Sequence, residues 1–238
     1  MKLRIVALVA MLALFGVLAR GPVSVAAQDM ASPAADQGNL DVSKLDGIEQ
    51  GISRSYMGDM SALMGGMGTP GADASATPDF SSLGLFSLDG AIFKFKDDSK
   101  AKAAFGTLSD EVTKAMSSDA KIQLKDEKVD GVGDNTKAFS GAIDAQGIST
   151  SVFVVMTQKD QFIYFTTGIS FSKDANEVKD STVHFTKALI DGKAGAGEGT
   201  VKTDGTSTGG LWGKFPAADN EVLKGLKPAA DQQIYPKK

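Results

Sequence analysis

Four methionines recur at short intervals in the first third of the chain, at Met57, Met60, Met64 and Met67. Thioether sulfur is a soft, uncharged ligand that selects Cu(I) or Ag(I) over harder divalent ions. On a helix this spacing would place all four side chains on one face. The same period suits a buried apolar stripe, so packing of an amphipathic turn is the alternative. We therefore expect either a soft-metal site, with Cu(I) as the one candidate cofactor, or simple packing.

The residues that catalysis would need are scarce. The chain has no cysteine, and its one histidine is His184. One imidazole falls far short of the four nitrogen or sulfur ligands of a zinc site. Ser181 and Asp180 lie beside His184, but neighbours on one helix cannot present the line of attack that a catalytic triad needs. The Ser-x-x-Lys spacing occurs at Ser99, Ser118 and Ser170 without its companion motifs, which indicates chance. We expect no enzyme, and a secreted hydrolase is the least favoured function.

The N-terminus predicts export. Two basic residues precede the apolar run from Ile5 to Leu18, which is too short to span a membrane. Val25, Ala26 and Ala27 supply the small residues that a signal peptidase requires. We expect residues 1–27 to be a cleaved signal peptide, the mature chain to begin at Gln28, and the protein to be secreted with no remaining membrane span.

The charge balance narrows the choice of partners. The whole chain has 25 Lys and Arg against 29 Asp and Glu, and three of the basic residues lie in the leader, which has no acidic one. The mature chain therefore carries 22 basic and 29 acidic residues, a net charge of −7. A balance of this sign disfavours nucleic acid and anionic lipid surfaces.

Hydrophobic periodicity places the core domain at residues 83–192. Strands are expected at 88–96, 122–124, 136–144, 148–157 and 162–169, the last two joined as a hairpin through Lys159 and Asp160. Helices are expected at 97–116 and 174–191, each with one apolar stripe, and Gly192 is expected to end the second in a left-handed conformation. We predict an α+β fold of order β-α-β-β-β-β-α: a mostly antiparallel sheet with both helices packed on one face.

The segments around this core are less regular. Residues 28–39 and 193–210 have the composition of linkers, and 40–82 form a Met- and Gly-rich N-terminal segment whose residues 40–57 fit either a short helix or a strand. Residues 211–238 form an apolar C-terminal tail, and we expect the N-terminal and C-terminal segments to be flexible. The large apolar side chains of the tail either fold back on the domain or dock on a partner.

Three stretches carry a resemblance to a known class. The stretch from Val129 to Phe139, the hairpin at 151–167 and the helix end at 188–190 resemble the sensor-like domains of exported bacterial proteins. These include the extracellular domains of receptor-type serine/threonine kinases and lipoproteins of the PsbP/Mog1-like α/β kind. The resemblance implies a non-catalytic binding or recognition module of the cell envelope or extracellular space, and it assigns no ligand residues. The expected partner is an unidentified protein, envelope component or small ligand.

Overall fold

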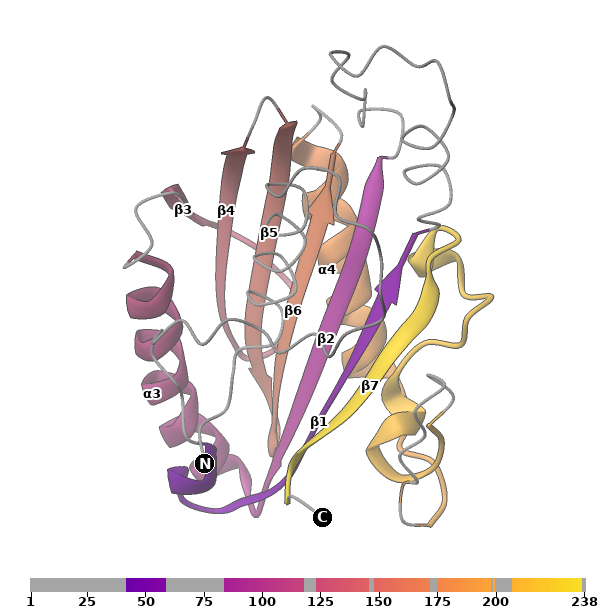
Figure 1. Cartoon of the computed structure of the whole chain (residues 1–238). Coiled ribbons are helices and arrows are strands. Elements are labelled where there is room, and N and C mark those ends of the chain that lie inside the picture. The colour runs from indigo at the N-terminus through magenta and orange to yellow at the C-terminus, as the bar shows by residue number, and fades with distance from the viewer. Residues whose placement is uncertain are drawn as a thin grey trace, which may run out of the picture.

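The computed structural model describes residues 42–58, 84–117, 123–145, 148–171, 175–197, 199 and 207–236. One seven-stranded antiparallel sheet organises these residues, in the order β3-β4-β5-β6-β2-β1-β7 (Figure 1). The strands are β1 (Ile48–Met57), β2 (Leu85–Phe95), β3 (Gln123–Glu127), β4 (Asn135–Ala145), β5 (Ile148–Lys159), β6 (Phe162–Ser170) and β7 (Lys227–Tyr235). The helices are α3 (Asp98–Ser117) and α4 (Ala175–Asp191), with short 3-10 turns at Val42–Lys44, Gly210–Lys214 and Glu221–Leu223.

The predicted α+β class and the predicted order of core elements are confirmed. The side chain of Asp97 accepts a hydrogen bond from the backbone N–H of Lys100, which caps the start of α3. Lys159 and Asp160 form the expected hairpin between β5 and β6, and Asp160 adopts a positive φ of 51°. Of the two alternatives for residues 40–57, the strand is present as β1.

The sheet extends beyond the predicted core. β1 pairs with β2, and β7 pairs with β1, so both segments that were expected to be flexible supply a strand. Figure 1 shows β7 lying alongside β1 at one edge of the sheet. Pairing with a formed neighbour stabilises β7, although its sequence, Lys-Pro-Ala-Ala-Asp-Gln-Gln-Ile-Tyr, has little strand propensity of its own.

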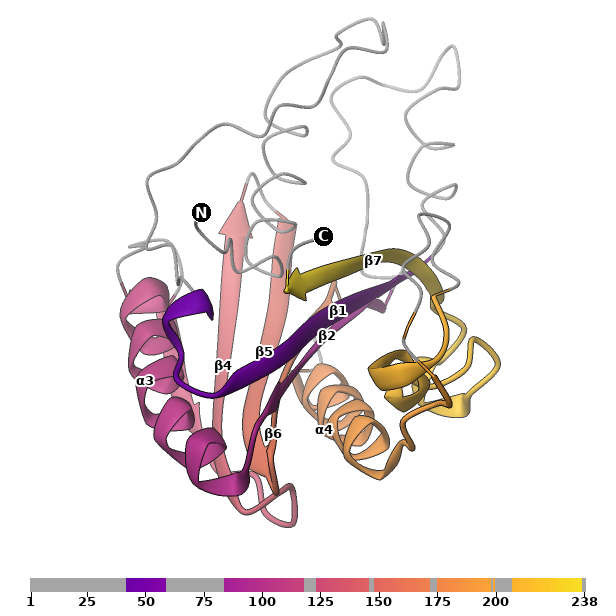
Figure 2. The ribbon, with the colours of Figure 1, turned by 90° about the horizontal axis from the view of Figure 1, so that it is seen from below.

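The prediction that both helices pack on one face of the sheet is wrong. Consecutive residues of a strand point to opposite faces, and Ile92 packs with α4 whereas Phe93 packs with α3. In Figure 2 the strands β4 to β6 run between the two helices. Apolar stripes on two helices show that each must be buried, but they do not say on which face.

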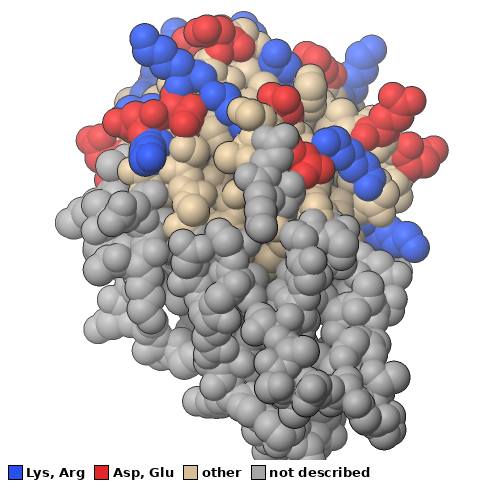
Figure 3. Space-filling view, turned by 90° about the horizontal axis from the view of Figure 1, so that it is seen from above, with Lys and Arg blue, Asp and Glu red and all other residues tan. Residues whose placement is uncertain are grey.

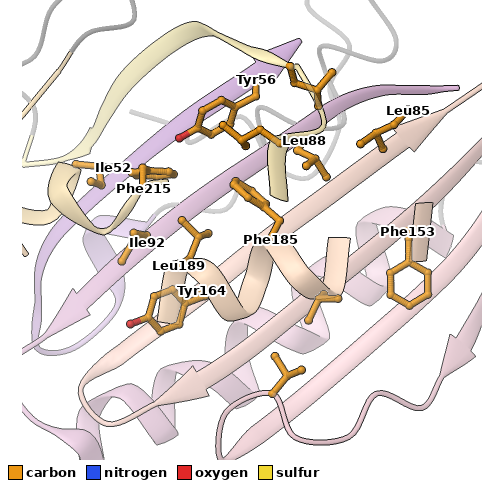
Figure 4. Packing of buried hydrophobic residues seen from close by; sticks show 14 of the residues in the cluster. Ile52, Tyr56, Leu85, Leu88, Ile92, Phe153, Tyr164, Phe185, Leu189 and Phe215 are labelled. Atoms are coloured by element: carbon orange, nitrogen blue, oxygen red, sulfur yellow. The ribbon is translucent and has the colours of Figure 1, made fainter. Parts of the chain in front are cut away.

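The larger hydrophobic cluster, here called the α4 core, lies between α4 and one face of the sheet. Tyr56 and Phe185 meet edge to face at its centre, with ring centroids 5.5 Å apart (Figure 4). Gly90 permits this close packing, because a Cβ there would lie 3.0 Å from Leu189 and 3.1 Å from Phe185. The C-terminal tail completes the cluster with Leu211, Trp212, Phe215, Leu223 and Leu226. The tail therefore folds back on its own domain.

The smaller hydrophobic cluster, here called the α3 core, covers one end of the opposite face. Phe105 and Leu108 of α3 pack there against Phe93, Phe95 and Ile163 of the sheet. Val42, Leu45 and Ile234 close its margin. The cluster does not include Val152, Val154 or Ile169, which lie farther along the same face and are also buried. This second part of the face is where the candidate site lies.

Candidate functional site

A row of side chains crosses four strands on the α3 face, beyond the α3 core. The register places Ser55 of β1 opposite Asp89 of β2, Asp89 opposite Thr167 of β6, and Thr167 opposite Val154 of β5. Directly opposite residues in antiparallel strands have Cβ atoms about 5 Å apart, so neighbours in this row are in contact range. We call Ser55, Asp89, Thr167 and Val154 the Asp89 row.

Asp89 is the charged centre of the row. Its half-buried carboxylate accepts a hydrogen bond from the hydroxyl of Ser55 and one of 3.2 Å from Ser87 Oγ. Burial raises the pKa of Asp89 to about 6, and the two serine hydroxyls only partly oppose that effect. None of the groups that shift the pKa of Asp89 is a cation. The row therefore contains a carboxylate that is costly to ionise and that lacks an opposite charge among the described residues.

The hydroxyl of Thr167, opposite Asp89, is a second unusual polar group on this face. The residue is 4% exposed, and within the described part of the chain its Oγ1 has no hydrogen-bond partner. Thr150, 1% exposed and on the same face of β5 as Val154, is in the same situation. Buried hydroxyls are normally paired, because an unpaired one costs about 1–3 kcal/mol. Among the described residues, two of the three buried hydroxyls without a hydrogen-bond partner therefore lie on this face.

The remaining surroundings of the row are apolar. Val152 and Ile169 face each other one step farther along the strands, and both are buried. Met57 lies on this face as well, opposite Ser87, and is half-buried at the end of β1. The row thus combines a polar centre with an aliphatic strip.

The other face of the sheet shows how this fold pairs its buried charges. Arg54 donates two hydrogen bonds to Asp231, of 2.6 and 2.8 Å, and one of 2.7 Å to the carbonyl of Ser207. Its guanidinium lies 5.4 Å from the ring centroid of Trp212. Although burial acts to raise the pKa of Asp231, the bonds from Arg54 and Ser207 hold it below its usual value. This pair joins β1 to β7 and the tail.

Lys214 secures the tail on the same side. Its ammonium donates to the carbonyls of Leu189, Ile190 and Gly192, at 3.4, 3.1 and 2.6 Å, and so caps the C-terminus of α4. Burial lowers the pKa of Lys214. Gly192 is not left-handed as predicted. It is a glycine because a Cβ there would overlap the backbone of Lys214.

The structure describes some of the residues that the sequence singled out, but not all of them. Met57 is described, whereas Met60, Met64 and Met67 lie outside the described residues, as do the signal peptide and the predicted start at Gln28. His184 is exposed on α4. Within the described residues there is no group of three or more His, Cys, Asp or Glu side chains that could hold a metal ion.

The stretch that carries the sequence resemblance has a structural role. Gly131 and Gly133 both have a φ of 69°, a left-handed conformation that glycine adopts freely. The turn they form buries Val132 in the α4 core and directs its carbonyl to the hydroxyl of Thr157, 2.8 Å away. The motif is therefore explained by packing.

The described part of the face shown in Figure 3 carries charges of both signs. In Figure 3, Lys and Arg side chains alternate with Asp and Glu over the visible described part of the face. Several of them pair, as Lys159 does with Asp134 at 2.8 Å and Lys179 with Glu127 at 2.8 Å. None of the helices that the structure describes is long and apolar enough to cross a membrane.

The sequence contained a signal for the Asp89 row that was not used. Asp89 lies in a run of apolar residues, Leu85 to Phe95, where an acid is unexpected. Its tripeptide Leu88-Asp89-Gly90 is identical to Leu45-Asp46-Gly47. The two glycines have different roles in the structure. Gly90 leaves room for the side chains of α4, whereas Gly47 is a turn residue with a φ of 78°.

The fold and the site define an α+β domain with one seven-stranded antiparallel sheet and a helix on each face. No family model matches the chain, and no curated protein matches it. Among solved structures, it is similar to the extracellular domain of PknH from Mycobacterium tuberculosis. The TM-score is 0.29 and the identity 12%, over 62% of this chain and 92% of that domain. The similarity is loose, and no ligand or residue role is carried over from it.

Proposed function

We propose that this protein is an exported, non-catalytic binding module whose ligand occupies the Asp89 row. One observation carries the proposal: within the described part of the chain, the buried hydroxyl of Thr167 has no partner and lies directly opposite Asp89, a carboxylate without a counter-charge there. Each group alone costs stability, and a bound ligand that completes both would offset that cost. The row offers groups that hold a ligand, and His184 lies away from it on the outer side of α4.

Export rests on the leader sequence. N-terminal sequencing of the protein from its own culture medium should find Gln28, or a residue within a few positions of it, as the first residue. An intact Met1 on exported protein would contradict cleavage.

The binding proposal is tested on that same secreted protein. We expect a native mass spectrum to show a retained small ligand in the parent and in the exposed control Asp126→Asn, but not in Thr167→Val or Asp89→Asn. Asp126 is a suitable control because it lies in the same sheet on the edge strand β3 and is exposed. If the parent retains no ligand, and hydrogen exchange of β2 and β6 is unchanged by an extract of the medium, the row is not a binding site.

A second candidate function is soft-metal binding through the methionines. It is favoured by Met57, whose side chain is half-buried at the end of β1 on the same face as the Asp89 row. The mature protein should then take up about one Cu(I) through sulfur and show little affinity for Zn(II).

A fourfold replacement of Met57, Met60, Met64 and Met67 by Leu removes the sulfurs and preserves the apolar volume. Uptake should be lost in that variant and retained in the control Met156→Leu, which changes a buried methionine of the α3 core. Equal uptake by both variants would leave the four methionines with a packing role only.

A further inference from the structure

Residues 207–236 attach to the rest of the domain as a separate piece would. They are here called the arm, the described residues from 42 to 199 are called the body, and residues 200–206 connect the two. In the monomer the arm docks on its own body. We propose that the arm is exchangeable: two copies of this chain form a dimer in which each arm docks on the body of the other copy.

The contact between arm and body has the composition of an interface between two proteins. Arg54 of the body lies over the rings of Trp212 and Phe215 of the arm, 5.4 and 5.3 Å from their centroids. In return, Lys214 of the arm lies over the ring of Tyr164 of the body, 5.5 Å from its centroid. Arginine and aromatic side chains are enriched at protein interfaces and supply much of their affinity. Each part therefore presents a cation to the aromatic rings of the other.

Strand pairing and an ion pair align the arm on the body. β7 lies at one end of the sheet that the structure describes, so its removal leaves the other six strands paired. It docks on β1 by antiparallel pairing, which is also how many proteins bind an extended segment of another chain. Arg54 and Asp231 are direct partners in this register and fix it. Each of these contacts joins the body to the arm, so the arm of a second copy can make all of them.

Glycines flank the connection between the two parts on both sides. Gly197 precedes it with a φ of 76°, and Gly209 and Gly210 follow it with φ values of 78° and 48°. Glycine adopts left-handed and right-handed conformations about equally readily, so the direction of the chain can change at these positions. The eight steps from Gly199 to Ser207 reach at most about 28 Å when extended. This reach allows the arm to pass to a second copy that lies beside its own body.

The energetics of the arm make a second copy its alternative partner. Trp212 and Leu223 of the arm are buried in the α4 core with Tyr56 and Phe185 of the body (Figure 4), so an undocked arm exposes apolar surface on both parts. The exchanged contacts are the same as those in the monomer, which makes such exchange a low-cost route to a dimer. A short connection holds the arm near its own body at an effective concentration of about millimolar order. We therefore expect the monomer in dilute solution and exchange when concentrated chains fold together.

Complementary variants of the mature chain test the exchange. Arg54→Met leaves Asp231 without its cation, and Asp231→Ala leaves Arg54 without its carboxylate, in the monomer and in the homodimer of either variant. An exchanged dimer with one copy of each has a native pair at one interface and neither charge at the other. After the two variants are unfolded together in urea and refolded, we expect at least about tenfold more heterodimer than either homodimer. Light scattering and native mass spectrometry measure the two species.

Lys179 and Glu127 provide the matched control pair. Their charged atoms are 2.8 Å apart, and Lys179 also lies over the ring of Phe153 at 5.7 Å, but all three residues belong to the body. Exchange of arms cannot restore this pair. A mixture of Lys179→Met and Glu127→Ala should therefore show no excess of heterodimer.

A disulfide reporter identifies the body on which each arm is docked. Ser53 and Gln232 are direct partners of β1 and β7, and the chain has no cysteine of its own. In the double variant Ser53→Cys and Gln232→Cys, the bond forms within one chain in the monomer and between two chains in an exchanged dimer. A non-reducing denaturing gel separates the two products. The product linked between chains should increase as the protein concentration during refolding is raised.

The reporter decides the outcome. A bond that stays within one chain at every concentration overturns the proposal, even if dimers form, because those dimers keep their own arms. An equal excess of heterodimer in the control mixture overturns it as well. The reporter variant retains Arg54 and Asp231, so it gives an answer even if the complementary variants do not fold.

Discussion

The two faces of the sheet treat buried polar side chains differently. On the α4 face, Arg54 is paired with Asp231, and Lys214 binds three carbonyls. On the α3 face, Asp89 has no counter-charge among the described residues, and Thr167 and Thr150 have no hydrogen-bond partner there. One buried hydroxyl on the α4 side, that of Ser181, is also without a hydrogen-bond partner among the described residues. The contrast indicates that the buried polar groups described on the α4 face contribute more to stability than those described on the α3 face.

The largest effect should come from opening the α4 core. Phe185 is fully buried, and Phe185→Ala should lower the free energy of unfolding by about 4–5 kcal/mol through lost burial and a cavity. Phe105 of the α3 core is 9% exposed, so Phe105→Ala should cost about 3 kcal/mol. Urea denaturation measures both. A smaller loss for Phe185 than for Phe105 would contradict the view that the α4 face is the main source of stability.

Breaking the ion pair of the α4 face should rank next. Asp231→Ala leaves Arg54 buried without its partner and should cost about 3 kcal/mol at pH 7. Because the pKa of Asp231 is held below its usual value, this contribution is present above pH 4 and is lost as the pH falls through the folded-state pKa. Urea titrations at pH 7 and pH 3 measure the difference. The exposed Asp126→Ala should change little at either pH.

The Asp89 row should respond in the opposite direction. Burial raises the pKa of Asp89 to about 6, so its ionisation destabilises the folded state relative to the unfolded state. The free energy of unfolding therefore falls as the pH rises from about 4 to 6. Asp89→Asn should therefore raise the free energy of unfolding at pH 7 by about 2 kcal/mol and change it little at pH 4. Thermal unfolding of the ligand-free protein at the two pH values measures this. A destabilised Asp89→Asn at pH 7 would show that the carboxylate is structural.

The smallest expected effect compares adjacent threonines on opposite faces. Thr167→Val replaces an unpaired hydroxyl with a methyl group and should stabilise the protein by about 1 kcal/mol. Thr166→Val removes a hydrogen bond to Thr186 and should destabilise it by about 1 kcal/mol. Urea denaturation of the two variants side by side provides the measurement. Changes of the same sign would remove the distinction between the faces.

Much of this architecture could be predicted from periodicity. The expected helices at 97–116 and 174–191 correspond to α3 and α4 within one residue at each end, because caps and apolar stripes are local features. The strand β7 was missed because its stability comes from pairing with β1, which is not a local feature. The sequence does indicate that the helices lie on opposite faces. The residues of β5 and β6 are apolar on both faces of the sheet, so both faces must be buried.

The candidate site was harder to predict than the fold. Ser55, Asp89 and Thr167 come from three strands that are distant in sequence, and only the register brings them together. The four methionines form a conspicuous sequence pattern because they are close in the chain. A single acid inside an apolar strand is a weaker pattern, yet it is the one with a clear energetic cost.

The pairing of β1 with β7 has a consequence for the order of events in folding. Arg54 and Asp231 are 177 residues apart, and their strands are neighbours in the sheet. Contacts of such long sequence separation form late and slow the search for the native state. A chain with this topology cannot complete its sheet until β7 has been synthesised. The edge of the sheet beside β1 therefore stays open, with unpaired backbone groups, until β7 docks on it.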